Sequence, residues 1–102
     1  MLYEVALNIS YYQYGPATTP GQREARREGL EYCTVIIEAD TEWNARHGAI
    51  KIAADHYQSR FDEAYYGDSQ LGLHTVRPAR ANSTAGTVKE LGTKVPNWAR
   101  PL

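Results

Sequence analysis

Residues 30–46 read LEYCTVIIEADTEWNAR, and this stretch runs from the pattern of a β-strand into the start of an α-helix. Between Leu30 and Ala39 apolar side chains fall on both sides of an alternating pattern, which is typical of a strand in the middle of a sheet. One side holds Cys33, Val35, Ile37 and Ala39, and the other holds Tyr32, Thr34, Ile36 and Glu38. Asp40 or Thr41 then caps a helix, and Glu42 lies in its first turn, where a carboxylate suits the helix dipole.

This helix is predicted to run from Thr41 to Ala64. At about 100° per residue, one apolar stripe about 80° wide is predicted to face the core. Its members are Trp43, His47, Ile50, Ala54, Tyr57, Phe61 and Tyr65. A smaller strip on the opposite side holds Ala45, Ala49, Ile52 and His56. A helix lying alone on a sheet does not need that strip, so we predict a homodimer with Ala45, Ala49 and Ile52 at its interface. Cover by Leu91–Trp98 of the same chain is the alternative.

Two further strands are expected. Residues Tyr3–Tyr11 alternate between apolar odd positions and polar even positions, which predicts a half-buried strand. A shorter strand is predicted over Leu71–Arg77, stopped by Pro78. Between the first two strands a polar loop at 15–29 includes a tract of helix formers, Gln22–Glu28, with about two helical turns expected.

The rest of the chain is predicted to be looser, over residues 79–102. A short helix is expected from Ser83 or Thr84 to Leu91, with Gly92 as its stop. The order of elements predicts one α+β domain over residues 1–102. We expect a small antiparallel sheet of about three strands, covered on one face by one long helix, with short extra helices.

The segment Val35–Arg46 resembles the strand, Ala-Asp-Ser/Thr-Glu, Ala-Arg helix segment of small β-β-α-β accessory proteins encoded by bacteriophages or mobile elements. The resemblance covers about a dozen of the 102 residues. It implies a style of fold and an origin, and it transfers no catalytic residue.

Composition sets further expectations. Ile, Leu, Val and Phe together make 18 of the 102 residues, whereas the chain has 8 Tyr, 2 Trp and 13 Ala. The core is therefore predicted to use tyrosine rings and close packing at alanine, and such a thin core favours a second copy of the chain. No apolar run reaches the roughly 18 residues of a membrane span, and the N-terminus lacks the pattern of a signal peptide, so the expected location is cytoplasmic.

Catalytic and metal sites receive little support. Cys33 with His47, His56 and His74 suggests a thiol nucleophile, but a cysteine on the apolar face of a central strand is more often a small core residue. The candidate metal ligands are Asp40, Glu42, His47, Asp55 and His56. No two histidines are three or four residues apart, and His47 is predicted to be a satisfied core histidine. We therefore expect no catalytic residue, no metal and no cofactor, and a protein that is not an enzyme.

A binding site is predicted at the end of the first strand and in the polar loop. Arginine forks bind phosphates and carboxylates, and tyrosine rings are frequent at binding hot spots. The predicted site residues are Tyr12, Tyr14, Arg23, Arg26 and Arg27. The competing interpretation is a solvated loop in which Glu24, Glu28 and Glu31 neutralise the arginines.

The charge is uneven along the chain. Residues 71–102 carry five cations and one carboxylate, a sum of +4, so residues 1–70 carry −5 of the total of −1. Five dispersed cations argue against nucleic acid as a ligand, and a tail docked on an acidic body is expected instead. The leading hypothesis is a non-enzymatic interaction protein that binds and inhibits a host protein complex, such as a defence system. The alternative is a small-molecule binder that sequesters a nucleotide through its Arg/Tyr site.

Overall fold

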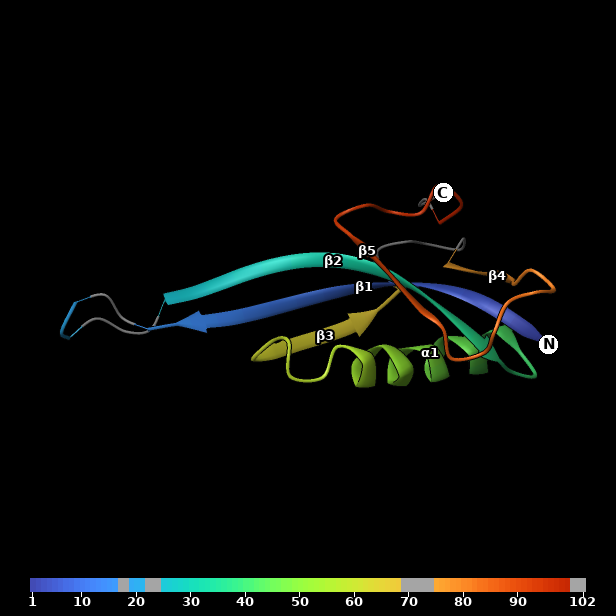
Figure 1. The fold of residues 1–102 in the computed structure, drawn as a ribbon, viewed down its shortest axis with the longest axis horizontal. Helices are drawn as coiled ribbons and strands as arrows, with labels where there is room; N and C mark the ends of the chain where they lie inside the picture. Colours follow the sequence, from blue (N-terminus) through green and yellow to red (C-terminus); the bar gives the residue numbers. More distant parts are fainter. Residues whose placement is uncertain (17–18, 22–24, 69–74, 100–102) are drawn as a thin grey trace.

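The computed structural model describes residues 1–16, 19–21, 25–68 and 75–99 of the chain. Its elements follow the order β1 (Leu2–Gly15), β2 (Ala25–Glu38), α1 (Glu42–His56), β3 (Glu63–Gly67), β4 (Val76–Pro78) and β5 (Val88–Gly92). The strands form one antiparallel sheet in the order β3-β1-β2-β5, and β4 also pairs with β1. Helix α1 lies against one face of this sheet, and the C-terminal segment lies on the other side (Figure 1).

The α+β class is confirmed, but the sheet has five strands rather than about three, and α1 is the one α-helix of the described ranges. The short helix predicted from Ser83 or Thr84 to Leu91 is wrong, because Val88–Gly92 forms β5 on the open edge of β2. The backbone turns into this pairing through two hydrogen bonds, from Ile36 to the Thr87 carbonyl and from Gly86 to the Ile36 carbonyl. Hydrogen bonds to the free edge of β2 stabilise this segment more than its local preference for a helix does.

Strands β1 and β2 form a long hairpin of 14 residues on each side, paired from Leu2 with Glu38 to Gly15 with Ala25. The helical turns predicted for Gln22–Glu28 are therefore wrong from Ala25 onward, and residues 22–24 lie outside the described part. Gly29 allows the strand to continue here. A Cβ atom built on Gly29 would lie 2.1 Å from the Tyr11 ring, which packs across it and stacks on Phe61 at 4.0 Å.

Helix α1 begins at the predicted cap, because the Thr41 hydroxyl accepts a hydrogen bond of 3.1 Å from the Asn44 N–H. It ends at His56 rather than at Ala64. Ser59 has a φ of 69°, which a continuing α-helix does not allow. Ala64 belongs to β3, where it pairs with Tyr11 of β1.

The face of α1 that packs on the sheet is the opposite of the predicted one. Ala45, Ala49 and Ala53 are fully buried, whereas Trp43 is 68% exposed. The strip that the sequence assigned to a dimer interface thus lies in the core of this chain, with Ile52 partly buried against the same cluster. Small side chains occupy the contact between α1 and the sheet because they let the helix axis approach the sheet closely.

His47 is exposed and stacks edge-on against Trp43 at 4.3 Å between ring centroids, so its prediction as a core histidine is wrong. Two aromatic residues near the far end of the predicted stripe, Tyr57 and Phe61, do reach the core after the helix has ended, whereas the prediction for Tyr65 is wrong because it is 61% exposed. Tyr57 is 1% exposed, and Phe61 packs against the buried cluster.

The main core lies between α1 and the sheet and contains the odd positions of β1, as their alternation predicted. Its buried members are Tyr3, Val5, Leu7, Ile9, Cys33, Val35, Ala45, Ala49, Ala53, Tyr57 and Val76. A smaller cluster on the other face joins Ala6 to Ala99, with Tyr32 and Trp98 packed against it. The C-terminal segment is therefore a third layer over the sheet, and the long helix does not need it as cover.

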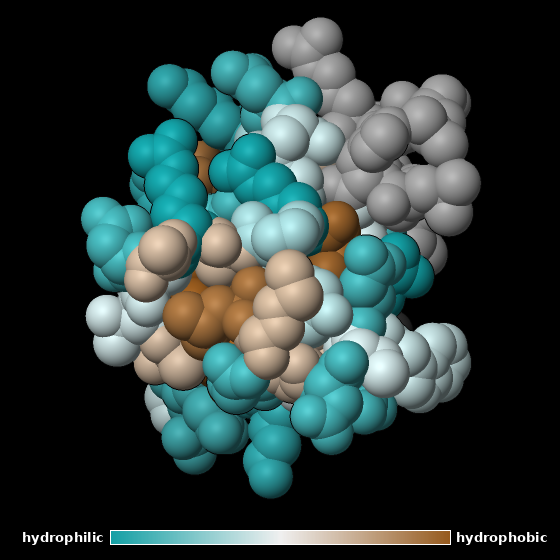
Figure 2. All heavy atoms as spheres, turned by 90° about the vertical axis from the view of Figure 1, so that its right-hand side faces the viewer, coloured by the Kyte–Doolittle hydropathy of each residue, from teal (hydrophilic) through white to brown (hydrophobic). Residues whose placement is uncertain are grey.

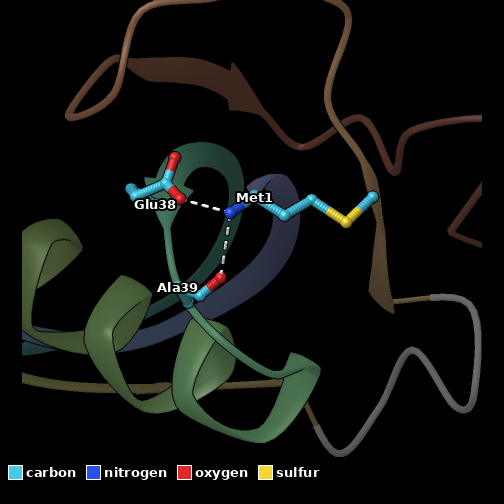
Figure 3. A network of polar contacts seen from close by, with 3 residues as sticks. All are labelled: Met1, Glu38 and Ala39. Atoms are coloured by element: carbon cyan, nitrogen blue, oxygen red, sulfur yellow. Dashed lines mark hydrogen bonds and ion pairs between the residues drawn. The ribbon is translucent and has the colours of Figure 1, made fainter.

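The N-terminus lies at one end of the molecule, beside the end of β2 (Figure 1). In Figure 2 apolar side chains gather at the centre of this end, and hydrophilic ones surround them. The Met1 amine contacts the Glu38 carboxylate and donates a hydrogen bond of 3.3 Å to the Ala39 carbonyl (Figure 3). These contacts tie the start of β1 to the end of β2.

Candidate functional site

The outer half of the β1–β2 hairpin reaches beyond the body of the protein (Figure 1). The chain measures 56 Å along its longest axis and 27 Å along the next, and the hairpin lies along the longest axis. Strand β5 pairs with β2 from Tyr32 to Val35, so no strand of the described residues pairs with the outer edge of β2 over Ala25–Glu31. A free strand edge exposes backbone donors and acceptors that another chain can pair with.

The opposite edge of the hairpin is closed. The Asp62 N–H donates to the Tyr12 carbonyl at 3.2 Å, and the Asp62 carboxylate accepts from the Tyr14 N–H at 2.7 Å. The Gln13 side-chain amide donates to the Arg60 carbonyl at 2.9 Å. The segment that follows α1 therefore braces one side of the hairpin and leaves the β2 side open.

Strand alternation separates the predicted site residues onto two faces. Tyr12, Tyr14 and Arg26 lie on the face turned away from α1, because Tyr11 and Cys33 of the same strands face the helix. Arg27 pairs with Gln13 and lies on the helix side. Arg23 lies outside the described residues.

The face turned away from α1 has the composition of a contact surface. We call the five side chains Tyr12, Tyr14, Arg26, Glu28 and Leu30 the outer hairpin face. Tyr14 is 43% exposed and Leu30 is 38% exposed. The Arg26 guanidinium stacks over the Tyr12 ring at 3.9 Å from its centroid, so this ring is already covered on one side. Leu30 is not among the predicted site residues, because the sequence pattern places it in the central strand.

A cavity of about 430 Å³ lies beside the hairpin, lined by Arg26, Arg27, Arg60 and Phe61 among others. Most of its cations already have carboxylate partners. Arg26 lies 3.6 Å from Glu28, and Arg60 contacts Glu90. A nucleotide phosphate would have to compete with these pairs, which weakens the case for a nucleotide in this cavity.

A second polar region lies on the sheet face opposite α1. The Glu4 carboxylate of β1 accepts hydrogen bonds of 2.6 Å from the Arg77 guanidinium of β4. The same guanidinium lies 4.3 Å from the centroid of the Trp98 ring. Arg77 is therefore held between a carboxylate and an aromatic face, and it joins two strands to the C-terminal layer.

Two neighbouring cavities share these residues. One has a volume of about 420 Å³ and is lined by Glu4, Arg77, Pro78, Arg80, Ser83 and Lys89. The other, of about 380 Å³, shares Glu4, Arg77 and Lys89 with it and extends to Trp98. The cations of this segment are visible in the sequence, but their contact with Glu4 is not, because Glu4 is 73 positions away from Arg77 along the chain.

Cys33 is fully buried in the main core. Burial raises the pKa of its thiol to about 12, against a smaller lowering by the Tyr57 hydroxyl. A thiol that keeps its proton at neutral pH is a poor nucleophile, so the structure supports the prediction that Cys33 is a core residue.

Among the residues that the structure describes, no group of three His, Cys, Asp or Glu side chains is arranged to hold a metal ion. His74 lies outside the described part. In that same part, no helix is long and apolar enough to cross a membrane. Comparisons with family models, curated proteins and solved structures found no match for this chain.

Proposed function

We propose that this chain is a non-enzymatic binding protein that docks on another protein through the outer half of its β1–β2 hairpin. The observation that carries the proposal is the combination of a free strand edge over Ala25–Glu31 with the outer hairpin face beside it. The edge supplies main-chain hydrogen bonds, and the side chains of the face supply selectivity.

The residue types of the outer hairpin face suit this role. Tyrosine and arginine are enriched among residues that dominate binding energy, and the fold does not bury Tyr14. Charged residues along β2, among them Arg27, Glu28 and Glu31, discourage indiscriminate pairing at the open edge. A partner strand must therefore match their charge pattern.

The proposed partner is a host protein or protein complex, such as a bacterial defence system that the protein inhibits. This part of the proposal rests on the resemblance of Val35–Arg46 to small accessory proteins of bacteriophages or mobile elements. A homodimer is compatible with the same open edge, since two copies can pair β2 with β2, but Ala45 and Ala49 are buried and cannot form its interface.

Site-specific photocrosslinking tests the proposal. A photoreactive amino acid replaces Leu30 in one version of the protein and Lys51, on the exposed side of α1, in a matched control. We expect bacterial lysate to yield a discrete crosslinked protein from position 30 and none from position 51.

The captured protein is then purified and titrated against Tyr14→Ala and Lys51→Ala. We expect Tyr14→Ala to weaken binding by about tenfold or more, and Lys51→Ala to leave it within about twofold. Equal effects of the two substitutions, or equal crosslinking from both positions, would show that the hairpin is not the binding surface.

A further inference from the structure

We infer that the paired cavities on the sheet face opposite α1 form a binding site for the phosphate group of a small ligand. The site is separate from the outer hairpin face and does not depend on the function proposed for it. Its polar lining consists of Arg77, Arg80, Ser83 and Lys89 together with Glu4.

Unpaired charge is the first argument. Within the described residues neither Arg80 nor Lys89 lies within 4 Å of a carboxylate, although both line the same cavity. The site has three cations and one carboxylate, so its net charge is +2. Like charges held together in one cavity repel each other, and a bound dianion would relieve that repulsion.

The geometry of Arg77 is the second argument. Glu4 and Trp98 hold its guanidinium from two sides, and the side chain of Glu4 is 20% exposed. A preoriented guanidinium loses little freedom when it binds an anion, and its remaining N–H groups can donate to phosphate oxygens. Glu4 thus positions Arg77, and the charge of its carboxylate, which also lines the cavity, is offset by that guanidinium.

The polar side chains of this site come from separate parts of the chain that the fold brings together. Arg77 belongs to β4, Lys89 to β5, and Arg80 and Ser83 to the segment between them. Ser83 adds a hydroxyl, which can donate to a phosphate oxygen beside the cations. By contrast, the cations Arg26 and Arg60 beside the hairpin are paired with carboxylates, so the cavity that holds Arg80 and Lys89 suits an anion better.

Trp98 supplies a built-in reporter, and Trp43 supplies its control. The chain has two tryptophans, and Trp98 lines the cavity whereas Trp43 is exposed on α1. NMR titrations follow both indole N–H signals while inorganic phosphate, adenosine monophosphate or uncharged adenosine is added. We expect phosphate and adenosine monophosphate to shift the Trp98 signal with dissociation constants in the millimolar range or tighter, and Trp43 to stay in place.

A matched pair of substitutions localises the effect. Lys89→Ala and Lys51→Ala remove the same side chain, from the cavity and from the helix surface respectively. We expect Lys89→Ala to weaken binding of adenosine monophosphate by about tenfold and Lys51→Ala to leave it within about twofold. Arg80→Ala is expected to act like Lys89→Ala, with the melting temperature unchanged because neither cation supports a carboxylate.

Four outcomes would overturn the inference. The Trp98 signal does not move with phosphate or adenosine monophosphate; adenosine moves it as strongly as adenosine monophosphate; or Lys51→Ala weakens binding as much as Lys89→Ala. In the fourth, a short single-stranded DNA binds although phosphate and adenosine monophosphate do not, which would make the surface a nucleic-acid contact.

Discussion

At the scale of single residues, Cys33 and Tyr57 bury two ionisable groups in one core. Burial raises the pKa of Tyr57 above its ordinary value of 10.0, and it raises that of Cys33 from 9.0 to about 12. Both groups hold their protons more tightly in the folded chain than in the unfolded one. Their contribution to stability is therefore complete below about pH 9 and is lost as the pH rises toward 12.

The expected result is a free energy of unfolding that falls between pH 9 and the alkaline limit, measured by urea denaturation at a series of pH values. Tyr57→Phe removes one of the two groups and should make this fall shallower. Tyr14→Phe, at an exposed position, is the matched substitution with which the slope of Tyr57→Phe is compared. Rapid alkylation of Cys33 in the native protein at neutral pH would contradict the reasoning.

Gly48 occupies the middle of α1, where glycine costs about 1 kcal/mol relative to alanine. A Cβ atom at this position would lie 2.3 Å from Cδ1 of Ile37. Because Cδ1 is the far end of a partly buried side chain that can rotate away, we expect Gly48→Ala to be neutral or to stabilise the protein by up to about 1 kcal/mol. In an Ile37→Val background, which removes Cδ1, the same substitution should give the full gain in helix propensity. Urea denaturation of the double-mutant cycle measures this coupling.

At the scale of elements, α1 packs on the sheet through alanine. Ala49 is fully buried, so Ala49→Leu should destabilise the fold by about 1–3 kcal/mol through overpacking. Trp43→Ala, on the exposed side, should change the free energy of unfolding by less than about 0.5 kcal/mol. Thermal denaturation with light scattering checks both. A change of oligomeric mass in Ala49→Leu without loss of stability would restore the strip as an interface between copies.

The start of this helix was predictable and its orientation was not. Thr41 as the cap and Glu42 in the first turn follow from local chemistry, which the sequence contains. Which face of α1 is buried depends on the distance between the helix and the sheet. The apolar periodicity favours burial of the large rings of Trp43 and His47. At the short distance in the structure, only small side chains such as Ala45 and Ala49 fit between the helix and the sheet.

The hairpin shows the same limit. The alternation of Tyr3–Tyr11 predicted β1 and its buried side correctly. The charged tract from Ala25 onward reads as helix formers, yet it becomes strand because β1 offers it a pairing edge along its whole length. Pairing between distant segments is a tertiary effect that overrides local propensity. For the same reason the contact between Glu4 and Arg77 could not be inferred from the chain alone.

At the scale of the whole molecule, Arg77 connects the sheet to the C-terminal layer. Arg77→Ala would leave the Glu4 carboxylate without its partner and remove the contact with Trp98. We expect a loss of about 1–3 kcal/mol in the free energy of unfolding, together with faster amide hydrogen exchange at Ala99. Arg80→Ala removes an unpaired cation and serves as the control. Equal stability of the two variants would show that Arg77 does not hold the layers together.

The position of β1 in the sheet also shapes how the chain can fold. This strand pairs with β2, β3 and β4, and its contact with Arg77 closes a loop of 73 residues. The hairpin can assemble as soon as β2 has left the ribosome, but β3 and β4 reach the other edge of β1 only later in synthesis. A native state rich in such long-range pairs forms more slowly than one built from local contacts. Until β3 and β4 have been synthesised, the nascent chain exposes the outer edge of its first strand, and this is the period when it is most prone to associate with other chains.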